Sequence, residues 1–177
     1  MNTGRLSVAI RLAPALFAFL SAGMAGAACD FELDATDRRE TKMLTVARGM
    51  NTGLAAHLGV FQGDYYLKGR FFSQFTATPE FTQDHPLELT LDDGTILRLA
   101  VIQGGTGKWD PHPMLVNNRE AQPRFAVSAE QARQLIERRI VHLRITHLAE
   151  GRLRVREYEV KTKHAARLAE GMRCIAG

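Results

Sequence analysis

Three arginines near the C-terminal end are the residues whose type and spacing most clearly indicate a binding surface. Arg154 and Arg156 follow Arg144 after a turn at 149–151. If that turn closes a three-residue loop, the bulged register places Arg144 opposite Arg156 and brings Arg154 and His142 onto the same face. Like charges directly across two strands repel. Such a row is easier to retain when an anion, a carboxylate from elsewhere in the fold or a partner surface lies against it, and the ordinary alternative is a solvated face.

A second candidate binding place is the loop that contains the single tryptophan of the chain. Trp109 and His112 lie in a segment with a glycine-rich run at 104–107 and two prolines. An aromatic side chain on a loop often anchors a partner, although a tryptophan folded back over a sheet edge has the same pattern. The run ending in Lys108 is not a phosphate-binding loop, because Ile102 stands where that motif needs glycine and Trp109 where it needs serine or threonine.

Local motifs for metal binding and nucleophilic catalysis are missing from the sequence. His142 and His147 would lie on opposite faces of a strand. None of the six histidines has the spacing of a metal-ligand pair, and the two cysteines do not form C-x-x-C. The chain also lacks the G-x-S-x-G elbow of many hydrolases. We therefore expect no catalytic residue, metal or cofactor from these motifs, and a site assembled from distant segments stays open.

The two cysteines lie near the two ends of the expected mature chain. Cys29 and Cys174 allow one intramolecular pairing, which an oxidising compartment favours. Such a bond would close a long loop and stabilise the fold by about 4–5 kcal/mol in the chain-entropy description. Two free thiols are the alternative. A lipid anchor on Cys29 is not expected, because small residues precede it where a large apolar residue would be needed.

The first 27 residues have the build of a secretory signal peptide. Arg5 and Arg11 are their only charges, the run 12–20 is apolar, and Ala25–Ala27 supplies the small residues of a cleavage site. The apolar run is too short to cross a bilayer, and no later segment predicts a transmembrane helix. We expect cleavage near Ala27 and a single exported globular domain over residues 28–177, in the periplasm or secreted.

The clearest hairpin covers Leu87–Gln103, with its turn at 92–94. A three-residue loop with Gly94 in the left-handed conformation sets Leu89 opposite Leu97 and produces one continuous apolar face. A two-residue loop would set Leu89 opposite Arg98 instead. We therefore predict the bulged register.

The elements that must position the arginines fill the last third of the chain. Ser128 and Gln131 form a capping box that opens a helix of about ten residues. The strand Ile140–Leu148 follows, and its partner strand leads to a closing helix over Lys163–Arg173. The whole pattern predicts a β-rich α+β fold, an antiparallel sheet, sandwich or half-barrel with two short helices in the C-terminal third.

The small net charge of the expected mature chain argues against one class of partner, nucleic acid. Removing the signal segment lowers the net charge from +4 to +2, with 21 basic against 19 acidic residues, so we expect no nucleic-acid partner. We predict a non-enzymatic periplasmic binding protein that docks a protein partner in the cell envelope, as an inhibitor, an immunity protein or an accessory protein. The alternatives are a periplasmic hydrolase of cell-envelope material and an anionic-glycan-binding module.

Overall fold

The structure is a computed structural model that describes residues 29–177 except 51, 75–77, 106–107 and 111–117. The larger of its two sheets contains β1 (Phe31–Asp34), β2 (Arg38–Thr41), β3 (Leu44–Arg48), β4 (Thr52–Phe61), β5 (Asp64–Gln74), β8 (Val101–Gln103), β9 (Lys108–Asp110), β10 (Asn118–Ala121) and β11 (Arg124–Val127). The smaller contains β6 (Leu87–Leu91), β7 (Ile96–Leu99), β12 (Ile140–Ala149) and β13 (Arg152–Glu159). The helices are α1 (Ala129–Glu137) and α2 (Thr162–Ala176).

Every strand pairing in both sheets is antiparallel across the described part of the chain. The larger sheet has the order β1-β2-β4-β5-β10-β9, with β3 beside β4 and with β11 between β5 and β8. The smaller sheet has the order β13-β12-β6-β7, which leaves β13 at its edge. The predicted β-rich α+β fold with antiparallel sheets is confirmed.

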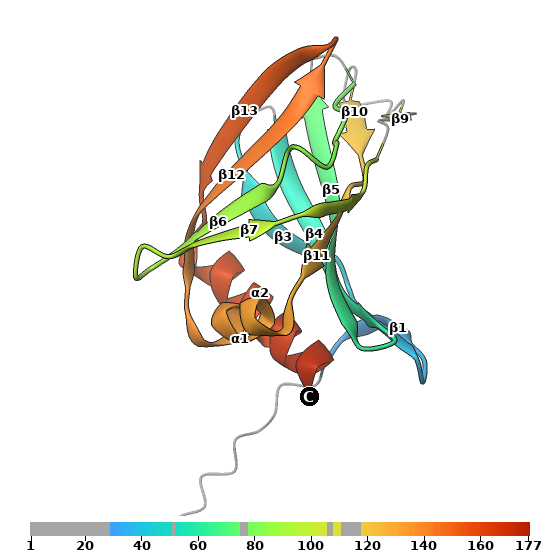
Figure 1. Cartoon of the computed structure of the whole chain (residues 1–177), viewed down its shortest axis with the longest axis vertical. Helices are drawn as coiled ribbons and strands as arrows, with labels where there is room; N and C mark the ends of the chain where they lie inside the picture. Colours follow the sequence, from blue (N-terminus) through green and yellow to red (C-terminus); the bar gives the residue numbers. More distant parts are fainter. Residues whose placement is uncertain (1–28, 51, 75–77, 106–107, 111–117) are drawn as a thin grey trace, which may run out of the picture.

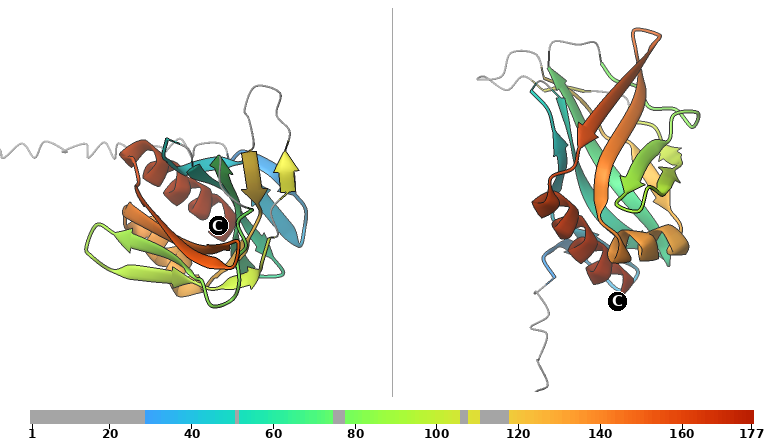
Figure 2. Two further views of the ribbon diagram at one scale, coloured as in Figure 1. Left: turned by 90° about the horizontal axis from the view of Figure 1, so that it is seen from above. Right: turned by 90° about the vertical axis from the view of Figure 1, so that its left-hand side faces the viewer.

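The two sheets face each other, and the two helices lie together across one end of them (Figures 1 and 2). Phe71, Phe125 and Leu58 from the larger sheet and Leu89 and Leu143 from the smaller sheet are at most 1% exposed. These side chains belong to one continuous apolar core. Burial of this core is the main favourable contribution to folding.

The predicted capping box begins α1 as expected. The Ser128 hydroxyl accepts a hydrogen bond from the Gln131 N–H, and the Gln131 side chain accepts one from the Ser128 N–H. The Gln131 amide also donates to the carbonyl of Arg98, which ties the start of the helix to the end of β7. The cap therefore sets both where α1 begins and how it meets the smaller sheet.

The last helix is longer than predicted and is joined covalently to the start of the described chain. Cys29 and Cys174 form a disulfide, so the predicted pairing is confirmed. On α2, Gly171 allows close packing on the larger sheet, because a Cβ there would lie 3.1 Å from the Cδ1 atoms of both Leu44 and Leu58. No helix in the described ranges is long and apolar enough to span a membrane. The predicted signal peptide lies outside the described residues.

The β6–β7 hairpin has the predicted bulged register. Leu89 pairs with Leu97, and Gly94 has φ of +86°. The second arm of the predicted hairpin does not continue to Gln103, because the chain leaves the smaller sheet after Leu99. The next strand, β8, pairs with β11 in the larger sheet instead. The crossing at Ala100 links the two sheets, since its carbonyl accepts from the Ala126 N–H.

The hairpin register has a direct thermodynamic test. We expect Leu89→Ala to lower the free energy of unfolding by about 2–5 kcal/mol, because Leu89 is 1% exposed in the core. The matched control is Ile96→Ala on the facing strand, where the side chain is 53% exposed; its cost should stay within about 0.5 kcal/mol. Urea denaturation measures both. Equal losses for the two variants would contradict the register.

Candidate functional site

The turn between β12 and β13 has two residues rather than the predicted three. Glu150 has φ of 53° and Gly151 has φ of 69°. Two successive positive φ angles are typical of the two-residue turn whose twist matches that of the flanking strands. The turn pairs Ala149 with Arg152, and therefore Ile145 with Arg156. The predicted register, which paired Ile145 with Val155, is wrong by one residue.

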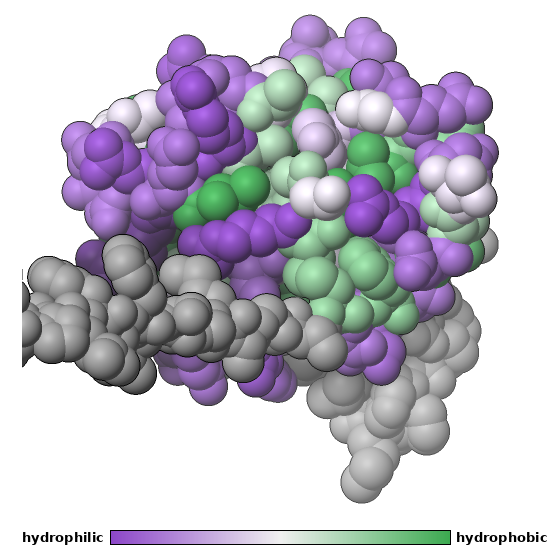
Figure 3. Space-filling view, turned by 90° about the horizontal axis from the view of Figure 1, so that it is seen from below, coloured by the Kyte–Doolittle hydropathy of each residue, from purple (hydrophilic) through white to green (hydrophobic). Residues whose placement is uncertain are grey.

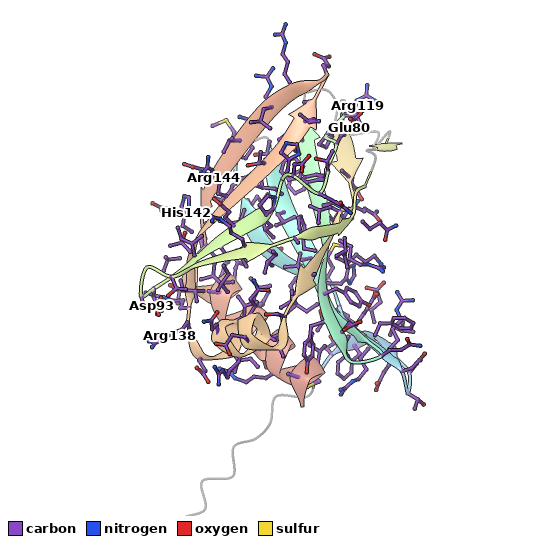
Figure 4. All side chains as sticks on the ribbon, viewed as in Figure 1. Glu80, Asp93, Arg119, Arg138, His142 and Arg144 are labelled. Atoms are coloured by element: carbon purple, nitrogen blue, oxygen red, sulfur yellow. A yellow bond between two sulfur atoms is a disulfide. The ribbon has the colours of Figure 1, made fainter. Side chains whose placement is uncertain are left out.

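The corrected register separates the arginines that the sequence placed in one row. Arg144 pairs with Glu157 rather than with Arg156. Its guanidinium lies 3.6 Å from the Glu157 carboxylate and 3.4 Å from that of Glu88. Arg144 shares its strand with His142, which is half-buried (Figure 4). Cross-strand attraction replaces the expected repulsion, so Arg144 and His142 lie on a charge-balanced outer face.

A different arginine row occupies the opposite face of β13. Arg152, Arg154 and Arg156 pair with Ala149, His147 and Ile145, whose side chains are buried between the sheets. The three arginines therefore share the inward-facing side of the strand, yet all three are exposed because β13 is the edge of its sheet. No described residue forms an ion pair with any of them. We call Arg152, Arg154 and Arg156 the arginine row.

His147 lies beneath the arginine row and does not neutralise it. Its side chain is 2% exposed and contacts the rings of Phe71 and Phe81, with ring centroids 5.0 Å and 5.8 Å away. Burial, together with the positive charges of Arg156 and Arg154, lowers the pKa of His147 to about 4. Its Nδ1 atom has no hydrogen-bond partner among the described residues. The site therefore combines a neutral buried imidazole with three exposed cations.

The tryptophan candidate lies in a short strand rather than in a loop. Trp109 is the central residue of β9 and pairs with Arg119 of β10. Its side chain and the whole of His112 lie outside the described residues. In Figure 1, β9 and the tip of β13 are at the same end of the molecule but on different sheets. The structure therefore does not join Trp109 to the arginine row.

Sequence reasoning missed a buried carboxylate on the outer face of the larger sheet. Glu40 is 4% exposed and accepts hydrogen bonds of 2.6 Å from the Tyr66 hydroxyl and from the Arg38 guanidinium. Lys68 lies 3.6 Å from its second oxygen. Burial raises the pKa of Glu40, but these hydrogen bonds and the Lys68 charge outweigh burial and lower it to about 2.

The partners of Glu40 meet because Gly59 lies between them on β4. Glu40 and Tyr66 both pair with Gly59, and a Cβ at that position would overlap the Tyr66 ring at 2.3 Å. The glycine thus allows the tyrosine to lie across β4 and reach β2. The one available signal in the sequence is this glycine within a strand pattern. The cluster is internally neutralised, so we interpret it as a clamp between strands.

The helix-capped end has a shallow groove of about 220 Å³ between α1 and α2. Arg138, Arg139 and Arg173 line it together with small α2 side chains. Arg138 lies 3.6 Å from Asp93 (Figure 4). Arg139 lies 3.9 Å from Asp92. Figure 3 shows this end from below, where apolar and charged side chains alternate over the surface. Because carboxylates already pair with Arg138 and Arg139, the groove is a weaker candidate for an anion site than the arginine row.

Comparisons with protein-family models, curated proteins and solved structures found no match to this chain. Within the described ranges, no group of three or more histidine, cysteine, aspartate or glutamate side chains is placed to hold a metal ion. The arginine row is therefore the candidate site on which the function is proposed.

His147 makes stability depend on pH in a defined direction. Its folded-state pKa of about 4 is below its ordinary value of 6.5, so the unfolded chain binds more protons between these values. The free energy of unfolding should fall by up to about 3 kcal/mol as the pH drops from 6.5 to 4. Denaturation of His147→Leu at several pH values should show a flatter slope. A slope equal to that of the wild type would contradict a buried neutral imidazole.

Proposed function

We propose that this protein is a non-enzymatic binding domain that docks an acidic protein partner through the arginine row on β13. The observation that carries the proposal is that Arg152, Arg154 and Arg156 lie side by side on one face without a carboxylate from any described residue. Three cations aligned in this way repel one another. An acidic partner surface relieves that repulsion, and the isolated domain leaves it uncompensated.

The alignment of three unpaired arginines on one strand distinguishes the row from the other charges of the domain. Among the described residues, six other arginines also lack a carboxylate partner, but no two of them share a strand: Arg39, Arg48, Arg119, Arg124, Arg167 and Arg173. The arginines that each lie within 4 Å of a carboxylate are Arg38, Arg70, Arg98, Arg133, Arg138, Arg139 and Arg144. A domain that leaves three unpaired arginines aligned on one strand has the charge distribution of an interface that is completed by another molecule.

Compartment and size support a role in the cell envelope. The disulfide between Cys29 and Cys174 is typical of proteins in an oxidising compartment, and the first 27 residues predict export. We place the domain in the periplasm, where it would act as an inhibitor, an immunity protein or an accessory protein of an envelope-acting partner. An anionic glycan would use the same cations, so the test must separate glycan from protein.

The proposal is tested by reversing the charge of the row. Immobilised wild-type domain should capture a defined protein from periplasmic extract, and Arg154→Glu with Arg156→Glu should abolish that capture. The matched control is Lys163→Glu with Arg167→Glu on the exposed side of α2, which changes the net charge equally and should retain the protein. Capture should also weaken as salt rises, because exposed charges are screened over about 8 Å at physiological ionic strength. Mass spectrometry identifies what is bound.

Three outcomes would contradict the proposal. The first is equal capture by the row variant and the wild type. The second is retention of acidic polysaccharide alone, which would favour the glycan-binding alternative. The third is the absence of any protein that the α2 control retains and the row variant loses.

A further inference from the structure

The free edge of β13 has main-chain groups directed away from its own sheet. On β12, the Leu148 N–H donates to the Glu80 carbonyl and the Leu148 carbonyl accepts from the Glu80 N–H, both at 2.9 Å. Leu148 therefore directs its main-chain groups away from β13. Its cross-strand neighbour is Leu153, so this pair is not hydrogen-bonded, and the N–H and C=O of Leu153 point to the outer edge.

In an antiparallel ladder, the main-chain groups of successive residues point alternately toward and away from the paired strand, so the direction found at Leu153 repeats at every second residue. Val155 and Glu157 have the same parity as Leu153, so their N–H and C=O groups also point outward. The arginine row has the opposite parity, so its main-chain groups bond to β12. Among the described residues, β12 is the one strand hydrogen-bonded to β13. The segment from β3 to β4 approaches β13 without pairing at the Tyr158 end, where the Tyr158 hydroxyl donates to Thr52. Figure 2 shows β13 along the border of the smaller sheet.

The two faces of this edge differ in chemistry. The arginine row lies on one face, whereas Leu153 and Val155 lie on the other and are 58% and 38% exposed. An exposed edge with such alternation is a template for a further strand. A strand added here would bond its main chain to Leu153, Val155 and Glu157, and its side chains would alternate between the cationic and the apolar face.

We propose that β13 binds an extended segment of the partner by strand addition, and that acidic residues alternate with apolar residues in that segment. This inference rests on the proposed function and specifies its mode. In an antiparallel pairing, residues opposite the arginine row would form non-hydrogen-bonded pairs, whose Cα atoms are about 4.5 Å apart and whose side chains are closest. Acidic side chains at those positions meet the guanidinium groups, and apolar ones between them cover Leu153 and Val155.

A second copy of this chain does not fit the same edge. Antiparallel pairing of β13 with itself would place arginine opposite arginine on one face of the ladder, which is unfavourable. The charge pattern thus selects against self-association and in favour of an acidic strand. An amphipathic helix would leave the outward N–H and C=O groups of β13 unpaired, so the edge favours an extended partner.

The test removes an outward N–H without touching the arginine row. Val155→Pro deletes that donor, and proline is tolerated on an edge strand when its missing N–H would have faced solvent. The matched control is Val155→Thr, which keeps the N–H and a β-branched side chain. The probe is a synthetic peptide of about eight residues in which glutamate alternates with valine. Calorimetric titration should give at least about tenfold weaker binding for Val155→Pro than for the control.

The possible outcomes distinguish the failure of strand addition from the failure of docking on the arginine row. If Val155→Pro binds the peptide as tightly as Val155→Thr does, while Arg154→Glu with Arg156→Glu does not bind, strand addition is overturned and docking on the arginine row stands. If neither change weakens binding, both proposals are overturned. A peptide of the same composition with its glutamates grouped at one end should bind at least about tenfold more weakly than the alternating peptide.

A second measurement keeps the inference testable if Val155→Pro fails to fold. Amide hydrogen exchange of the wild-type protein should slow at Leu153, Val155 and Glu157 when the alternating peptide is added. Unchanged exchange at these three amides in the bound state would overturn strand addition.

Discussion

The proposed binding surface depends on the two-residue turn at Glu150 and Gly151. Both residues have positive φ, and the turn sets the pairing of every residue along β12 and β13. Because side chains alternate between the faces of a strand, a shift of one residue relative to β12 would change which main-chain groups and which side chains face each neighbour. In the observed register Arg144 lies beside the carboxylates of Glu88 and Glu157, and the arginine row occupies one face of the edge strand β13.

The remainder of the fold holds this hairpin in place without neutralising it. The smaller sheet is anchored through buried side chains such as Leu143 and Leu89, while the disulfide joins α2 to Cys29, just before β1. His147 fills the space under the arginine row as a neutral group against Phe71. Elsewhere on the sheets, as around Glu40, several carboxylates and cations are paired. The row is the place on the described strands where three unpaired arginines share one strand.

The sequence supported correct predictions where local rules and burial agree. Leucines on both arms of β6–β7 specify the register, Ser128 and Gln131 specify the start of α1, and two cysteines allow one intramolecular pairing. The β12–β13 register was predicted wrongly because matching Ile145 to Val155 assumed that both are buried. Val155 is exposed, and the one buried residue of β13 is Tyr158, which has the parity of the arginine row. The two-residue turn and the burial of Tyr158 opposite Leu143 therefore both fit the observed register. The Glu40 cluster joins β2 to β5 across Gly59 of β4. No local sequence pattern predicts that side chains from these two strands come into contact.

Residue-resolved amide hydrogen exchange of the free protein tests the central claim, the register that leaves β13 with a free edge. In the observed register, exchange is expected to be slow at Arg154 and Arg156, whose N–H groups bond to β12. It is expected to be fast at Leu153, Val155 and Glu157, whose N–H groups point outward. The alternative three-residue loop would direct the Leu153 and Val155 amides toward β12. Protection of those two amides, with fast exchange at Arg154 and Arg156, would contradict both the register and the binding surface built on it.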